Sequence, residues 1–369
     1  MQVNASILKI VCLFWLIAKI ISINAWLTNR LFPVVPPFEV LANVPSIVHK
    51  LLFYASCLCL SVILFFKVKR SFIIVLLVLE LTSCMLDIIR WQPWEYQYIF
   101  ILLAFLFCKN TKAFYTSLLF ILSSLYIFSG LHKFNGGFLH YVWERILLHG
   151  YFGFSYTFIK AAKLHYAGVL LAFIETACGV ALLLMKDKKW PLALLAFMHV
   201  FVLFALGPLG IDYNSVIWPW NLAMIIVLYN VQVNSQYLKG AALIPKIFKI
   251  SLLLFWCILP IANFAGYWDS FLSSSLYSGN SWNATICISN TSTTKVLQEY
   301  YIKYDRFAIC NGDTGISMHN WAITELNVVP YSEIWYFKKF IKAWDKKYPD
   351  ASVKFIVSPY PYKVHTEIR

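Results

Sequence analysis

The residues with the clearest chemical potential gather just after a long apolar run. They form the stretch Ser129-Gly-Leu-His-Lys-Phe-Asn-Gly-Gly137, in which His132 and Lys133 are adjacent. A helix from Lys112 to Lys133 would be about 30 Å long, which puts Lys133 near the far boundary of a bilayer's hydrocarbon layer. A lysine in such a half-dry site can lose its proton and act as a base. The alternative is a lysine that extends its charge to the membrane surface for structural reasons.

A second group of ionisable side chains follows within residues 133–163, a segment rich in Trp, Tyr, Phe and His. On a helix, His140 and Glu144 would be one turn apart, and so would Arg145 and His149. Imidazole and carboxylate groups at this spacing can pass protons in acid–base catalysis. The composition predicts an interfacial or re-entrant helix in this segment.

Two acidic side chains lie within one apolar segment. Charged residues inside a membrane span cost about 2.5–3.5 kcal/mol on insertion scales, so each one invites a functional hypothesis. Glu80 and Asp87 share one face of a predicted helix, and Asp87 is placed to pair with Arg90. The alternative to a functional role is a structural ion pair at the membrane boundary.

Two more polar side chains lie in the middle of later apolar segments. Glu175 has Gly168 and Gly179 on its side of the helix, so that face could pack closely on another helix. His199 lies at the centre of the next segment. A protonated, hydrogen-bonded glutamic acid and a hydrogen-bonded core histidine are the structural alternatives.

The elements that must position these groups are membrane spans. The 369-residue chain is 60% hydrophobic and 13% charged, which argues against disorder and against a soluble fold. A span needs about 20 apolar residues. Candidate spans lie at 7–27, 50–66, 71–89, 94–108, 113–131, 164–185, 190–207, 214–232 and 247–266. The sequence therefore predicts an all-α polytopic bundle of about nine spans in residues 1–266, followed by a small α+β domain in residues 267–369.

Loop charge predicts the orientation of these spans. Basic residues follow every second span: Lys67, Lys69, Arg70, Lys109, Lys112, Lys186, Lys188, Lys189, Lys239, Lys246 and Lys249. Basic loops stay in the cytoplasm, so the N-terminus is predicted to be cytoplasmic and residues 267–369 exoplasmic, at the plasma (inner) membrane if the host is bacterial. This clustering explains the net charge of +14 better than a nucleic-acid surface does. No small-x-small cleavage site follows 7–27, which we interpret as a span.

The C-terminal residues differ in composition from the rest. Strands are predicted at 285–289 and, as the last one, at 353–357, with a strand or helix at 296–304 and an amphipathic helix at 332–347. Cys287 and Cys310 would form a disulfide if the compartment is oxidising. Seven other cysteines lie in or beside spans as small apolar packing residues. No metal-binding or nucleotide-binding motif is present, so no metal is expected.

Three segments carry a family resemblance. Tyr126-Ile-Phe-Ser-Gly-Leu-His-Lys-Phe-Asn135 resembles the hallmark segment of vitamin K-dependent gamma-carboxylases, within the horizontally transferred transmembrane domain (HTTM) family. That family is distantly similar to DoxX-like membrane proteins. His199–Ile211 with Trp218 resembles the family's later histidine helix, and Arg90–Tyr98 resembles its exoplasmic loop. The three segments cover about residues 80–232 and occur in the family's order.

The resemblance implies a site on the exoplasmic side. Lys133 corresponds to the family's base, and His199 to the histidine of the later helix. The cofactor implied is a quinone or a vitamin K-like hydroquinone. Its contacts are assigned to Trp94, Tyr98, His140, Trp143 and Trp218, and further proton handling to His132 and Glu144.

Two departures limit the resemblance. The chain has Gln92-Pro93-Trp94 where the carboxylases have an Asn-His pair, and its tail is far shorter than their lumenal region. The resemblance thus extends to the membrane scaffold and Lys133, without implying carboxylation of a protein substrate.

Three functions are open at this point. The first is an HTTM-type membrane enzyme with Lys133 as base near a lipophilic cofactor. The second is a non-catalytic scaffold whose exoplasmic tail binds a peptide or protein. The third is a transporter in which Glu80, Asp87, Glu175 and His199 line a polar path. Membrane lipids are partners in all three, and nucleic acid in none.

Overall fold

The computed structural model describes residues 5–66, 68–240, 242–303 and 309–368, which are mostly helical. The helices up to residue 131 are α1 (Ala5–Ile21), α2 (Ile23–Trp26), α3 (Ser46–Phe65), α4 (Arg70–Leu86), α5 (Pro93–Phe107) and α6 (Thr111–Leu131). The π-helix η3 (Phe138–Tyr151) and α7 (Tyr156–Ala161) follow, and then α8 (Ala167–Leu184), α9 (Lys189–Leu206) and α10 (Ile217–Val233). A last apolar helix consists of α11 (Lys246–Leu253), a π-helical turn (Leu254–Ile258) and α12 (Leu259–Asn263).

Among the described residues, five helices are long and apolar enough to cross a membrane. They are Ser46–Phe65, Thr111–Leu131, Leu164–Leu184, Lys189–Leu206 and Lys246–Asn263. Two further apolar helices, Pro93–Phe107 and Ile217–Val233, are shorter. Each segment predicted as a span contains a helix. The structure thus has the character of an integral membrane protein, as the composition indicates.

The chain divides into two compact units. The first comprises the described residues of Met1–Ala18, Cys57–Val78 and Pro93–Gly279. The second comprises Lys19–Ser56, Leu79–Gln92 and those of Asn280–Arg369. The C-terminal sheet is therefore built together with two segments from the first hundred residues. The division predicted from the sequence, into a membrane domain up to residue 266 and a separate domain from residue 267, stays a prediction.

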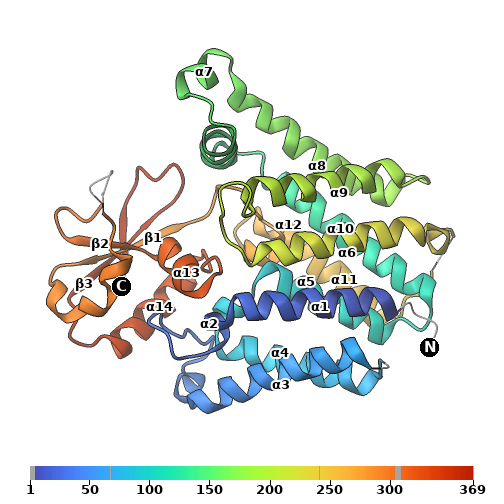
Figure 1. The fold of residues 1–369 in the computed structure, drawn as a ribbon, viewed down its shortest axis with the longest axis horizontal. Helices are drawn as coiled ribbons and strands as arrows, with labels where there is room; N and C mark the ends of the chain where they lie inside the picture. The colour runs from blue at the N-terminus through green and yellow to red at the C-terminus, as the bar shows by residue number, and fades with distance from the viewer. Residues whose placement is uncertain (1–4, 67, 241, 304–308, 369) are drawn as a thin grey trace. The chain divides into compact units, whose positions relative to one another are not determined.

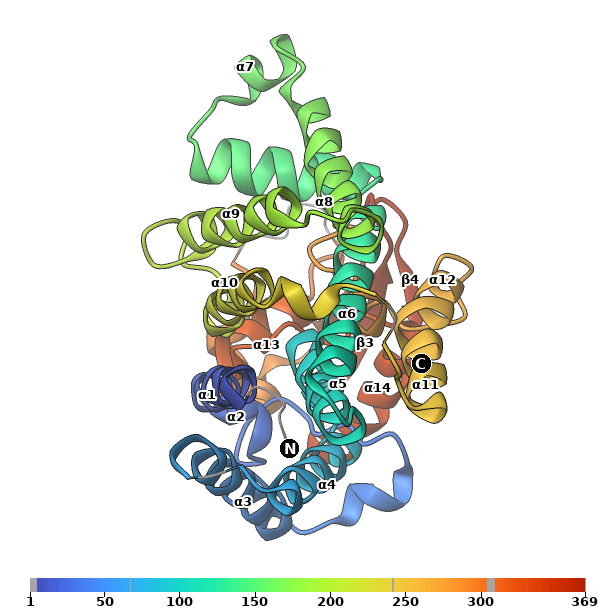
Figure 2. The same ribbon diagram turned by 90° about the vertical axis from the view of Figure 1, so that its right-hand side faces the viewer.

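In the first unit, α6 packs closely along α8, and α9 lies between α8 and α10 (Figures 1 and 2). Asn110 begins α6 by accepting a hydrogen bond from the Ala113 amide at 2.8 Å. Small residues allow the close approach: a Cβ at Gly130 would lie 2.6 Å from the Thr176 nitrogen, and one at Gly179 2.7 Å from the Ile127 nitrogen. Of the two glycines predicted to form a packing face beside Glu175, Gly179 therefore packs on α6, whereas Gly168 lies against Leu139 and Trp143 of η3.

The second unit contains a four-stranded antiparallel sheet of order β2-β1-β3-β4. Its strands are β1 (Asn283–Ile288), β2 (Thr314–Ser317), β3 (Val353–Ser358) and β4 (Thr366–Ile368). Two helices accompany them, α13 (Met318–Leu326) and α14 (Ile334–Lys347). The amphipathic α14 buries Phe340 and Trp344 against Trp321 and Phe355. Cys287 on β1 forms a disulfide with Cys310, with 5.3 Å between their Cα atoms.

The helix and strands predicted in the C-terminal residues are present, with three differences. β3 is not the last strand, because β4 follows it. Residues Thr291–Tyr300 form a 3-10 helix, which takes up most of the segment predicted at 296–304; its last residue lies outside the described residues. The short β2 and the helix α13 had no sequence signal strong enough to predict them.

Candidate functional site

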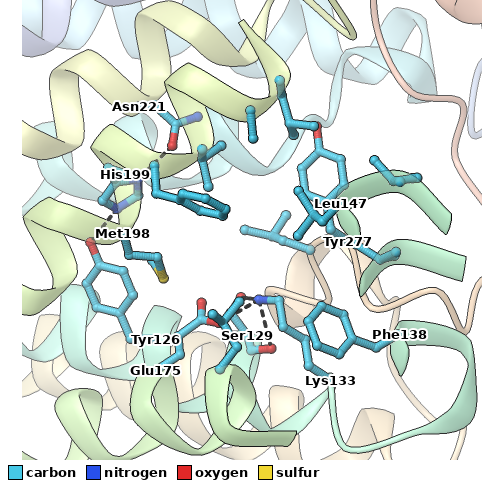
Figure 3. Close-up of a pocket in the computed structure, with 18 of the residues that line it drawn as sticks. Tyr126, Ser129, Lys133, Phe138, Leu147, Glu175, Met198, His199, Asn221 and Tyr277 are labelled. Atoms are coloured by element: carbon cyan, nitrogen blue, oxygen red, sulfur yellow. Dashed lines mark hydrogen bonds and ion pairs between the residues drawn. The ribbon is translucent and has the colours of Figure 1, made fainter. Parts of the chain in front are cut away.

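A cavity in the first unit brings together polar groups from four helices, α6, α8, α9 and α10. Its walls come from α6, α8, α9, α10, η3 and the segment around Tyr277. They surround about 930 Å³ of space between atoms, part of it open to the surface. Most of the lining side chains are apolar, among them Leu125, Phe138, Val142, Leu147, Leu171, Met198, Phe201, Val202, Leu206 and Leu276. Figure 3 shows the polar side chains at two places on this wall.

The first polar group is an ion pair between α8 and the residues that follow α6. The Lys133 Nζ lies 2.7 Å from the Glu175 Oε2, and it donates to the Ser129 hydroxyl at 2.7 Å and to the Ser129 carbonyl at 3.3 Å. Lys133 is 8% exposed and Glu175 3%. The three hydrogens of the ammonium group are thus all directed at acceptors, which is the condition for holding a charge in an apolar setting.

Only one of the two carboxylate oxygens of Glu175 accepts a hydrogen bond from the described residues. Its Oε2 accepts from Lys133, while its Oε1 has no hydrogen-bond partner among the described residues. Since a carboxylate oxygen can accept two hydrogen bonds, this atom can receive a donor from a molecule in the cavity.

The second polar group joins α6, α9 and α10. The Asn221 amide donates to the Ile217 carbonyl at 2.8 Å, which leaves its Oδ1 to accept from His199 Nδ1 at 2.7 Å. His199 therefore carries its proton on Nδ1, and its Nε2 accepts from the Tyr126 hydroxyl at 2.8 Å. The lone pairs of the Tyr126 oxygen stay available, so this group also offers an acceptor.

The segment that follows Lys133 packs against the last residues of the first unit, which ends at Gly279. Asn135 Nδ2 donates to the Ser278 carbonyl at 3.0 Å, and Gly137 touches Gly279 so closely that a Cβ on Gly137 would lie 2.2 Å from the Gly279 oxygen. Gly279 has a φ of +67°, which suits glycine. These contacts bring Tyr277 to the cavity wall, where burial raises the pKa of its phenol.

His132 and the pair on η3 lie near the cavity and are not part of its lining. His132 stacks on Phe264 with 4.4 Å between ring centroids, and burial followed by the charge of Lys133 lowers the pKa of His132 to about 4. His140 Nδ1 lies 3.1 Å from the Glu144 Oε2, which is the one-turn pair that the spacing predicts. Their part in proton handling stays a prediction.

The aromatic side chains assigned to a cofactor lie outside the cavity lining. Tyr98 packs between Trp94 and Trp15, with centroid distances of 6.4 and 5.6 Å. The indoles of Trp143 and Trp218 donate to backbone carbonyls of Leu164 and Leu206. These hydrogen bonds are structural, and contact between these four aromatic side chains and a cofactor stays a prediction.

The two acidic residues predicted within one apolar segment, Glu80 and Asp87, form ion pairs in the second unit. Glu80 pairs with Lys19 at 2.6 Å. Asp87 pairs with Arg30 at 2.5 Å, where the sequence predicts Arg90. The reason is that α4 ends at Leu86 and Asp87 is extended, with a φ of −159°, so a helical spacing of three no longer applies. The guanidinium of Arg90 instead donates to the Ser83 hydroxyl and to the backbone carbonyls of Ser83, Ala25 and Trp26, and it is hydrogen-bonded to His49.

Four polar residues of the cavity were not predicted from the sequence as members of a candidate catalytic or cofactor site. They are Tyr126, Ser129, Glu175 and Asn221. Tyr126 and Ser129 lie in the quoted motif, about two turns and one turn before Lys133, so their helical spacing was a usable signal. Glu175 was predicted as a structural residue or as part of a transport path, and Asn221 was not singled out. Both are brought to the cavity by helix packing, which local spacing does not encode.

The arrangement can hold an apolar molecule and exchange a proton with it. No group of three or more His, Cys, Asp or Glu side chains that could hold a metal ion occurs within the described ranges. Comparison of the chain with protein-family models, with curated proteins and with solved structures gives no match.

Proposed function

We propose that the chain is a multi-pass membrane enzyme of the HTTM type that its sequence resembles. In this proposal the cavity binds a lipophilic molecule, and the Lys133–Glu175 pair exchanges a proton with it. The observation that carries the proposal is a buried ion pair on the wall of an otherwise apolar cavity. Apolar side chains would hold the same helices together at no greater cost, so a charged pair facing a cavity suggests a chemical role.

The free hydrogen-bonding positions favour a ligand that carries a hydroxyl group. The ammonium of Lys133 is already saturated, whereas Glu175 Oε1 and the Tyr126 oxygen can each accept a hydrogen bond. A hydroquinone has hydroxyl donors and a quinone has only acceptors. The lining residues therefore fit the reduced form better, and such a cofactor would supply the redox chemistry.

The pair would act as one unit in proton transfer. As an ammonium ion, Lys133 has no lone pair, so Glu175 Oε1 is the first acceptor for a proton from the ligand hydroxyl. Lys133 stabilises the carboxylate before the transfer. If Lys133 then gives one proton to water at the open part of the cavity, its neutral amine can take the proton from Glu175, which restores both the ammonium and the carboxylate. The base expected at Lys133 is then shared between Lys133 and Glu175.

The proposed topology follows the alternating basic loops. We place the N-terminus in the cytoplasm, about nine spans in the membrane, and residues 267–369 on the exoplasmic side of the plasma membrane. A transporter is less favoured because Glu80 and Asp87 are paired with Lys19 and Arg30 and do not line the cavity.

Native mass spectrometry of the full-length protein, released from membranes, tests the proposal. We expect a lipophilic hydroxyl compound to remain bound to the wild type and to be lost from Glu175→Gln, whose amide keeps the volume and cannot form the ion pair. The matched control is Glu80→Gln, which makes the same change at a pair outside the cavity. Retention of the compound by Glu175→Gln, or its absence from the wild type, would refute the proposed site.

A further inference from the structure

Residues 134–166 expose an unusual number of large aromatic side chains; we call this segment the aromatic lobe. Phe134, Tyr141, Phe152, Phe154, Tyr156, Phe158 and Tyr166 are 37–61% exposed. A surface that faces water rarely carries so many large apolar side chains within one segment. Aromatic side chains do gather at the boundary between hydrocarbon and water in membrane proteins.

Positive charge accompanies these rings. The Arg145 guanidinium lies 5.6 Å from the Tyr141 ring centroid, and His149 stacks on Tyr156 at 4.2 Å. Lys160 and Lys163 are also exposed. The lobe's single carboxylate, Glu144, is 8% exposed and accepts a hydrogen bond from His140. The exposed charge of the lobe is therefore positive.

The direction of η3 suits a position in the plane of a membrane surface. In Figure 1, α9 and α10 run across the view while η3, next to α7, is seen end-on; Figure 2 shows η3 lengthwise. In the chain, η3 lies between α6 and α7, and α8 follows α7; the helical segments Thr111–Leu131 and Leu164–Leu184 on either side are long enough to span a bilayer. A crosswise helix at the ends of spanning helices lies at the depth of the lipid headgroups.

η3 has two different faces. Phe138, Val142 and Leu147 line the cavity, whereas Tyr141, Arg145 and His149 are exposed. One helix thus forms part of the cavity wall and also presents an aromatic and cationic surface to its surroundings.

We propose that the aromatic lobe binds anionic phospholipid headgroups. The rings would sit among the glycerol groups, and Arg145, Lys160 and Lys163 would pair with headgroup phosphates. Charge complementarity selects this occupant, because the lobe exposes cations and rings and no carboxylate. Bound lipid would fix the depth of η3 and so the shape of the cavity wall. This inference does not depend on the reaction proposed above.

Hydrogen exchange of the full-length protein in lipid nanodiscs tests the inference. We compare discs of phosphatidylcholine with discs of equal parts phosphatidylcholine and phosphatidylglycerol, and follow peptides from residues 138–163. We expect slower exchange in the anionic discs. Each surface cation contributes about fivefold to binding, so the triple variant Arg145→Gln, Lys160→Gln, Lys163→Gln loses a preference on the order of a hundredfold, and with it the difference between discs.

The matched control is Lys186→Gln, Lys188→Gln, Lys189→Gln, which removes three cations at the junction of α8 and α9. This control should keep the response of peptides 138–163 to the anionic lipid. Equal exchange in both discs for the wild type would overturn the inference. So would an unchanged response in the Arg145, Lys160, Lys163 variant, or equal protection in detergent, which would indicate a protein contact instead of lipid.

Discussion

Two buried Lys–Glu pairs in this protein have the same chemistry and different surroundings. Lys19–Glu80 and Lys133–Glu175 are 2.6 and 2.7 Å long, and each has a serine as third partner, Ser56 or Ser129. The first pair is 0% exposed on both sides. The second lies on the wall of a cavity.

The two pairs differ in whether the second carboxylate oxygen of the glutamate has a hydrogen-bond donor. Ser56 donates to Glu80 Oε1, and the Lys19 ammonium lies 3.3 Å from the Trp26 ring centroid, so both faces of that pair are covered. Glu175 Oε1 has no partner within the described residues and belongs to a cavity-lining side chain. Burial of a charge alone therefore does not mark a site. A buried charge with an open acceptor beside a cavity does.

The largest expected effect is on the stability contributed by Lys19–Glu80, which we call the closed pair because both of its faces are covered. Lys19→Ala leaves the Glu80 carboxylate buried without its cation, which costs about 3–5 kcal/mol of stability. Thermal unfolding of the purified protein in detergent measures the loss. The double variant Lys19→Met, Glu80→Gln removes both charges and should regain most of it. A single variant as stable as the wild type would mean that Glu80 is not held as a charge.

The next largest effect is a pH dependence of stability at His132. This residue precedes Lys133 of Lys133–Glu175, which we call the open pair because Glu175 Oε1 has no partner within the described residues. His132 has its pKa lowered from the usual 6.5 to about 4, so the unfolded chain takes up a proton first as the pH falls. The contribution of His132 should thus leave stability unchanged above pH 6.5 and reduce it, by up to about 3 kcal/mol, as the pH falls toward 4.

His132→Phe tests this dependence because it keeps an aromatic ring against Phe264 and removes the titrating group. Unfolding measured across this pH range should show a smaller loss for the variant than for the wild type. Parallel curves would show that His132 titrates alike in the folded and unfolded chain.

A smaller effect is expected from the helix contact that builds the open pair. Gly130→Ala would push a methyl group into the Thr176 backbone, at a cost of about 1–3 kcal/mol, and would move α6 away from α8. Gly150→Ala is the control, since its nearest neighbour would be 3.3 Å away. Equal melting temperatures for the two variants would contradict the tight packing of α6 on α8.

The smallest effect is at the second polar group of the cavity. Tyr126→Phe removes the hydroxyl that donates to His199 Nε2, which costs about 1 kcal/mol. In the wild type, ¹⁵N spectra of His199 should show a neutral ring protonated on Nδ1. In Tyr126→Phe the Nε2 resonance should shift, because it loses its donor. An imidazolium in the wild type would exclude the assigned hydrogen-bond directions.

The sequence predicted the helical segments well because each depends on a local run of apolar residues. It also singled out Lys133, because a lysine at the end of such a run is visible in the chain. The partner of Lys133 was not predictable in this way, since the contact with Glu175 depends on how α6 and α8 pack. The glycines beside Glu175 indicated a packing face without indicating which helix it meets.

The polar pairs in the second unit show the same limit. Asp87 was predicted to pair with Arg90 on the assumption that the helix continues, and the chain leaves the helix one residue earlier. Glu80 forms its ion pair with Lys19, which is 61 residues away in the chain. Contacts of this range follow from the tertiary fold, so spacing along the chain does not reveal them.

The central claim is that the open pair binds a lipophilic hydroxyl compound. Its most direct test is the binding of one lipophilic hydroquinone and of its quinone to the full-length protein in nanodiscs, followed by tryptophan fluorescence. We predict that the hydroquinone binds about tenfold more tightly, equivalent to one or two hydrogen bonds to Glu175 and Tyr126. We also predict that Glu175→Gln weakens this preference and Glu80→Gln does not. Equal binding of the two forms, or a preference for the quinone, would contradict the account.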